Sequence, residues 1–412
     1  MKHIFKLLSI ALLLTFIISC NDDDDNLISK SFTVTIKNVF EVKDYFNSGT
    51  ISESGIAPGT STSFSFNAGK GHYLQFGTML VKSNDLFYAP SDTGIALYDS
   101  NGNATTGNIT SQIKLWDAGT EVNETPGMGT NQPMNQSGPN TGTDENGNVH
   151  IVNDGFTYPS IEDVISVMIT HDGGTFFTVT INNISDTSTL DTPLAPGTWV
   201  VHSENQKPMF TEGDTASLAL EKLAEDGDNA TMDTNLSSKS GFVSPFAPGA
   251  YSIGTINEIF TTINTANTAL ENLAEDGNPS GFMNVFNTPK GSSSAGALFP
   301  NSSYSFTFTA NEGDSLSFGL MLVQSNDWFF GIDNITLFPN GIALSGDITN
   351  MVKLYDAGTE VDEFAGAGNS QPVRQTGANI GDSENGNVIE ESNLSANVPT
   401  ISTMIKVSII SN

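Results

Sequence analysis

Two stretches of the sequence carry the residue types that a cation site needs. KLWDAGTEVNE begins at Lys114 and KLYDAGTEVDE begins at Lys353, so an acidic, glycine-containing turn recurs 239 residues later. Each turn opens with an aspartate at the end of an expected strand, Asp117 or Asp356, and the Ala-Gly pair that follows lets the backbone turn tightly. Carboxylate and carbonyl oxygens that converge there would suit calcium. The alternative is an Asx-type turn, in which the aspartate only caps its own backbone amides.

The overall charge favours cations as ligands. The formal net charge is -31 with only 15 Lys plus Arg, which argues against nucleic acid and anionic lipid surfaces as partners. No GxSxG elbow occurs, and the histidines of the expected mature chain form no metal-spaced pair. These histidines are His72, His150, His171 and His202. We therefore expect a binding protein and not an enzyme.

The beginning of the chain predicts export and a lipid anchor. Residues 1–19 combine a basic start with a short apolar run, which is typical of a signal peptide. The run ends at Cys20, the only cysteine, so a lipobox with lipidation of Cys20 is predicted. The following NDDDDN, within the expected tether at residues 20–30, resembles the acidic export tag of Bacteroidetes surface lipoproteins. The expected location is the outer membrane, facing outward, with the lipid as the only membrane contact.

Alternating apolar and polar residues predict a mostly β chain that contains a duplication. FTVTIKNV from Phe32 and FTVTINNI from Phe177 share six of eight residues, and each is expected to open one unit. This pattern predicts two tandem antiparallel β-sandwiches, a shortened copy at residues 31–172 and a complete copy at residues 175–412. Two short amphipathic helices, in SLALEKLAEDG and NTALENLAEDG, are expected as insertions in the second copy only, with Gly227 and Gly277 as C-terminal stops.

Several motifs of the second unit resemble the spondin N-terminal domain, the family of F-spondin and mindin that also occurs in bacterial lipoproteins. DWF from Asp327, GID from Gly331 and LYDAGTE from Leu354 occur in the family's order. Upstream, FTVTINNIS, APGTWVVH and LAEDGD match the bacterial branch. The resemblance implies a C2-like β-sandwich whose loops at one end hold calcium.

The resemblance also implies which residues would bind the ion. Asp327 and Asp356 match the family's aspartate ligands, and the first unit keeps both as Asp85 and Asp117. The family's glutamate ligand aligns with Phe308 in the second unit and with Phe66 in the first. Because calcium takes six to eight oxygens, the set would be completed by backbone carbonyls, water or further carboxylates. The candidates for the further carboxylates are Asp333 and Glu360.

These inferences predict a lipid-anchored adhesion or binding protein supported by calcium, with an extracellular protein or glycan as its partner. Three alternatives remain open: a glycan-binding lipoprotein of a polysaccharide uptake system, a metal-dependent hydrolase, and a purely structural envelope protein without ligand or metal. Trp328 and Phe329 lie beside the expected metal turn and would form the contact surface if they are exposed, although a place in the core is the other interpretation.

Overall fold

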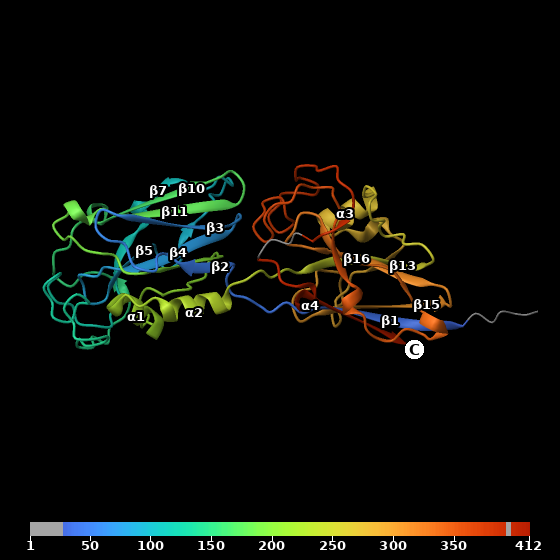
Figure 1. Cartoon of the computed structure of the whole chain (residues 1–412), viewed down its shortest axis with the longest axis horizontal. Helices are drawn as coiled ribbons and strands as arrows, with labels where there is room; N and C mark the ends of the chain where they lie inside the picture. Colours follow the sequence, from blue (N-terminus) through green and yellow to red (C-terminus); the bar gives the residue numbers. More distant parts are fainter. Residues whose placement is uncertain (1–27, 393–396) are drawn as a thin grey trace, which may run out of the picture.

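The computed structural model describes residues 28–392 and 397–412, which form two β-sandwiches beside each other (Figure 1). The mostly β fold class with short helices is confirmed. The predicted signal peptide, Cys20 and the tether up to residue 27 lie outside the described residues. Within those residues, no helix is long and apolar enough to span a bilayer.

The first sandwich consists of two antiparallel sheets. One has the order β3 (Ser61–Asn67), β11 (Phe176–Asn183), β10 (Ile165–His171), β7 (Gly107–Asn108). The other has the order β2 (Asn47–Thr50), β12 (Thr198–Ser203), β4 (His72–Met79), β5 (Leu86–Ala89), β8 (Lys114–Asp117), β9 (His150–Ile151), and β6 (Ile95–Ala96) also pairs with β4.

The second sandwich repeats this strand order. One sheet runs β15 (Ser303–Asn311), β1 (Ser29–Asn38), β21 (Ile405–Ser411), β18 (Gly346–Asp347). The other runs β14 (Asn284–Phe286), β13 (Phe246–Gly254), β16 (Ser315–Leu322), β17 (Trp328–Thr336), β19 (Lys353–Asp356), β20 (Ile389–Glu390). Short 3₁₀ turns connect the strands: η1 (Thr110–Gln112), η2 (Ile161–Asp163), η3 (Ser185–Thr187), η4 (Pro279–Gly281), η5 (Pro339–Gly341) and η6 (Thr349–Met351).

The alternating pattern of the repeated strand explains its place in each core. In β1 the side chains of Phe32, Val34 and Ile36 are fully buried, while the threonines between them face outward. One face of the strand therefore enters the apolar core between the sheets, as its two-residue period predicts. The same alternation places Phe177 and Val179 of β11 in the core of the first sandwich.

The predicted boundary at residues 172–175 is wrong, because each of the two repeated strands belongs to the sandwich that the other was expected to open. β10 and β11 form one antiparallel hairpin across that boundary, with Ile169 opposite Val179. β1, which was assigned to the first copy, lies between β15 and β21 of the second sandwich. The first sandwich is therefore inserted in the chain between β1 and β13, and its strand sequence is circularly permuted relative to the second.

The two predicted amphipathic helices exist, but their assignment to one unit is wrong. α1 (Leu218–Asp226) begins at an N-cap serine and α3 (Thr268–Asp276) at an N-cap asparagine; both end at the predicted glycines in left-handed conformation. α1 and α2 (Ala230–Lys239) pack against the first sandwich, and α3 packs against the second. The first sandwich is thus not a shortened copy. A further short helix, α4 (Ile401–Met404), precedes β21.

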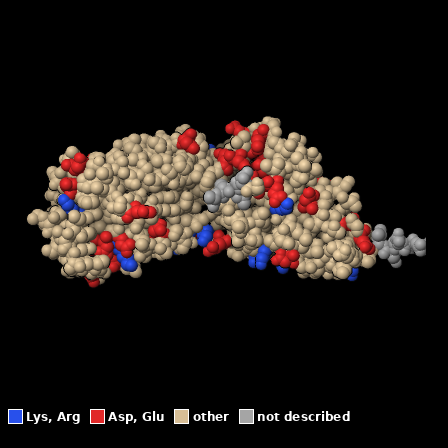
Figure 2. Space-filling view, in the orientation of Figure 1, with Lys and Arg blue, Asp and Glu red and all other residues tan. Residues whose placement is uncertain are grey.

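The sandwiches meet through a loop of the second that reaches the first. The Nη2 atom of Arg374 lies 3.3 Å from Nε2 of His72, and the Lys70 amide donates to Asn369 at 3.2 Å. Figure 2 shows that uncharged residues dominate the face in view, with acidic side chains in scattered groups and fewer basic ones.

Candidate metal centres

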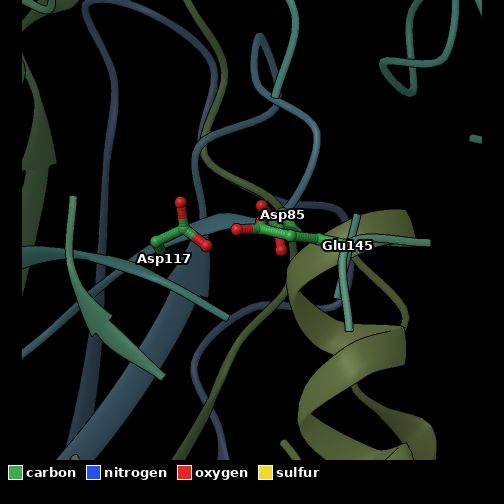
Figure 3. A group of neighbouring side chains, drawn as sticks. All are labelled: Asp85, Asp117 and Glu145. Atoms are coloured by element: carbon green, nitrogen blue, oxygen red, sulfur yellow. The ribbon is translucent and has the colours of Figure 1, made fainter. Parts of the chain in front are cut away.

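The first candidate centre lies where β8 ends beside the turn before β5. Asp117 is the last residue of β8, Asp85 immediately precedes β5, and Glu145 belongs to the loop that leads to β9 (Figure 3). Each residue offers one carboxylate oxygen, and these three oxygens lie within 4.8 Å of one another. The structure thus brings together Asp85 and Asp117, as predicted, with a third carboxylate that the sequence interpretation missed.

The two oxygens of Asp85 have different surroundings. Oδ2 accepts hydrogen bonds from the Thr120 amide at 2.7 Å, the Thr120 hydroxyl at 3.2 Å and the Glu121 amide at 3.1 Å. Oδ1 is buried and has no hydrogen-bond partner. An unpartnered buried carboxylate oxygen is costly, so its position beside two other carboxylates fits a cation.

The DAG turn fixes the geometry of Asp117. Its Oδ1 accepts a hydrogen bond from the Gly119 amide at 2.7 Å, which is the Asx-type turn that the sequence left open. Its Oδ2 accepts from Asn123 at 2.7 Å and lies 3.9 Å from Nε2 of His150. Gly119 has a positive φ of 68°, and a Cβ there would come within 2.7 Å of the Asn148 backbone. The turn therefore requires glycine whether or not an ion binds.

The second candidate centre combines different carboxylates around the equivalent turn. Asp356 ends β19 and lies with Asp362 and Glu391 in a group whose offered oxygens are within 4.8 Å of one another. Asp362 follows the turn in the repeated EVDE stretch, where the first sandwich has Asn123 in EVNE. Asp362 was therefore visible in the sequence as a difference between two quoted repeats, whereas no local motif marked Glu391.

Asp327 lies behind this group as a buried anchor of the turn. Its Oδ2 accepts from the Thr359 amide at 2.8 Å, the Thr359 hydroxyl at 3.1 Å and the Glu360 amide at 3.1 Å. Its Oδ1 is buried and unpartnered, as in Asp85. The structure therefore keeps the predicted Asp327 beside the centre, although the group of converging carboxylates does not include it.

Two of the predicted ligands form hydrogen bonds with asparagine side chains instead. Asp333 accepts a hydrogen bond from Asn257 at 2.9 Å and is exposed on β17. Glu360 is buried and accepts from Asn326 at 3.0 Å. This bond ties the loop between β19 and β20 to the turn before β17; this loop and its counterpart between β8 and β9 are called the acidic loops. Neither belongs to the group of three carboxylates.

The predicted contact surface at Trp328 and Phe329 is wrong. Trp328 is 5% exposed and Phe329 is fully buried. Trp328 packs in the core between the sheets, and Phe329 packs on the opposite face of its sheet under α3. Successive residues of a strand point to opposite faces, and here both faces are covered. The glycan-binding alternative therefore loses the aromatic surface on which it relied.

The electrostatics of both centres favour an added positive charge. Burial raises the pKa of Asp85, and the neighbouring Asp117 raises it further. Burial raises the pKa of Asp356 to about 7, with repulsion from Asp327 as the next cause. Burial and repulsion from Asp356 and Asp327 also raise the pKa of Asp362 to about 7. Carboxylates that repel one another in this way are stabilised when a cation lies between them.

Comparison with known proteins agrees with the motifs of the second sandwich. Residues 198–373 match the Spondin_N family model, a span that begins at β12 of the first sandwich and ends in the acidic loop of the second. No curated protein matches the chain. Residues 198–373 are thus similar to the Spondin_N family, a likeness that suggests an extracellular binding or adhesion module.

Proposed function

We propose that this protein is a lipid-anchored, cell-surface adhesion or binding module, and that calcium holds the acidic loop of each sandwich against its DAG turn. The lipid anchor at Cys20 and the outer-membrane location rest on the sequence. The calcium proposal rests on one observation above all, the buried and unpartnered Oδ1 of Asp85 beside Asp117 and Glu145.

The role of calcium in this proposal is structural. Glu145 and Asp117 belong to different segments, a loop and a strand end, so an ion between them would fix the loop relative to the sheet. Asp362 and Asp356 would do the same in the second sandwich. Backbone carbonyls and water would supply the remaining oxygens that calcium takes. A loop fixed in this way presents a preorganised acidic surface to a protein or glycan partner.

Thermal unfolding of the full-length chain with calcium and with chelator tests this proposal. A site with a Kd of about 10⁻³ M in roughly 10 mM calcium adds about 1.4 kcal/mol, or about 3 to 6 °C in Tm for a sandwich of this size. Glu145→Gln and Asp362→Asn should each remove part of this increase. Asp333→Asn is the matched control, because Asp333 lies outside both groups and should leave the increase intact. A Tm that does not respond to calcium in the unmutated chain would refute the proposal.

The hydrolase alternative now has one specific candidate residue. His150 lies 3.9 Å from Asp117 and is partly exposed, so it could act as a general base beside a bound metal. A screen with chromogenic ester, phosphate and glycoside substrates would test this role. Turnover that depends on metal and disappears in His150→Ala would replace the binding proposal, whereas no turnover is expected.

A further inference from the structure

The first sandwich has an apolar cavity on its surface. The cavity has a volume of about 400 Å³ and lies beside the edge strand β9. Its walls are mainly apolar side chains: Leu115, Ile151, Val152, Tyr158, Pro159 and Ile161. Ile151 is 38% exposed, so part of this apolar wall is open to solvent.

One charged side chain, Lys114, belongs to the described lining of this cavity. Lys114 is exposed, and its Nζ lies 5.3 Å from the ring centroid of Trp116. Among the ion pairs of the described residues, none includes Lys114. The cavity thus combines an apolar wall with a cation at its rim, in a chain whose formal net charge is -31.

The second sandwich has a different arrangement at the same positions. Lys353 is the counterpart of Lys114 in the repeated KLYDAG stretch, and it forms an ion pair with Glu390 on β20. The counterpart of Glu390 on β9 is Ile151, since each lies opposite the aromatic residue before the aspartate. The first sandwich thus has isoleucine where the second has glutamate. Its lysine therefore lacks this ion-pair partner, and the isoleucine adds an apolar side chain to the cavity wall.

We infer that this cavity binds a small organic anion with an apolar body, such as an aryl or branched alkyl carboxylate. The apolar body would occupy the space between Ile151, Tyr158 and Ile161, and the carboxylate would pair with the ammonium of Lys114. Burial of the body supplies most of the binding energy, whereas the exposed ion pair selects the sign of the head group. This site lies next to the first candidate centre along β8 but shares no residue with it.

Ligand-observed NMR and calorimetry with 4-phenylbutanoate test this inference on the full-length chain. Two matched probes, 4-phenylbutan-1-ol and 4-phenylbutan-1-amine, keep the body and change the head group. The carboxylate should bind saturably and more tightly than the alcohol, and the amine should bind most weakly. Absence of saturable carboxylate binding, or equal affinity for carboxylate and amine, would overturn the inference.

Three variants connect the binding to this cavity. Lys114→Gln should weaken carboxylate binding about three- to fivefold, the effect of one exposed ion pair, and leave the alcohol unchanged. Ile151→Glu should weaken it more than tenfold, because it restores the arrangement of the second sandwich. Lys353→Gln is the matched control and should have no effect. Carboxylate affinity that is unchanged in Lys114→Gln would refute the role of the lysine, and this exposed substitution is expected to fold normally.

Discussion

At the scale of single residues, the buried glutamate at the end of α3 lies in an environment that disfavours its ionised form. Glu275 is 4% exposed, and its Oε2 has no hydrogen-bond partner. Burial raises its pKa to about 7, with added repulsion from Glu360, Glu271 and Asp276. The folded chain therefore keeps this proton at a pH where the unfolded chain has lost it, which makes stability fall as the pH rises from about 4.5 to 7.

Glu275→Gln should remove this pH dependence. Glutamine keeps the shape and carries no charge, so the variant should match the unmutated chain near pH 4.5 and exceed it by about 1 to 2 kcal/mol at pH 8, after allowance for solvent screening. Urea unfolding at both pH values measures the difference. Glu271→Gln, one turn earlier on α3 and partly exposed, is the control. Equal gains from both substitutions would show that burial of Glu275 is not the cause.

The sequence located Asp85, Asp117 and Asp356 but not Glu145 and Glu391, and the reason lies in chain distance. Asp117 and Asp356 stand in repeated turns that any comparison of the two stretches reveals. Glu145 and Glu391 come from loops that fold back onto those turns, and they are not equivalent positions of the two repeats. Only the path of each loop through space determines which carboxylate lies beside the turn.

At the scale of elements, β1 is expected to stabilise a sandwich that is distant in sequence. Val34→Asp would place a charge in the core of the second sandwich and should cost at least about 3 kcal/mol there. Hydrogen exchange should then show loss of protection in β15 and β21, the neighbours of β1, while β3 and β10 keep theirs. The matched substitution Val179→Asp in β11 should give the reverse pattern. Loss of protection in β3 and β10 from Val34→Asp would contradict this assignment.

Local structure was predictable for these elements, whereas partner choice was not. The alternation in FTVTIKNV and the glycine after LAED predicted a strand and a helix end, and both are confirmed. Nearly the same strand sequence occurs twice, so the residues of β1 and β11 do not determine which sandwich each strand joins. That choice depends on contacts between β1 and two strands far along the chain, such as the pair Phe32 and Phe308, which local patterns do not contain.

At the scale of the whole molecule, Arg374 links the sandwiches and lies beside a buried histidine. Burial, together with the smaller effect of the positive charge of Arg374, lowers the pKa of His72 to about 3. Arg374→Met removes that charge, so the pKa of His72 should rise above about 3 while burial keeps it below the ordinary value of about 6.5. An NMR titration of the histidine rings measures the change.

One control variant separates the charge of Arg374 from its packing. Arg374→Lys keeps a positive charge and should keep the pKa of His72 low. A His72 titration that does not change in Arg374→Met would show that burial alone holds the imidazole neutral.

The inserted position of the first sandwich also bears on how the chain reaches its native state during synthesis. β1 emerges long before β15 and β21, whereas β3 and β10 are complete before β11 has been made. During that interval, β1 is a strand of nearly the same sequence as β11 and is available to pair with β3 and β10. We expect the short β10–β11 connection to resolve this competition, because a hairpin closes faster than a distant strand can be recruited. The duplication that gives both sandwiches the same strand order thus creates a competition between β1 and β11 during synthesis, and closure of the β10–β11 hairpin leaves β1 free to enter the second sandwich.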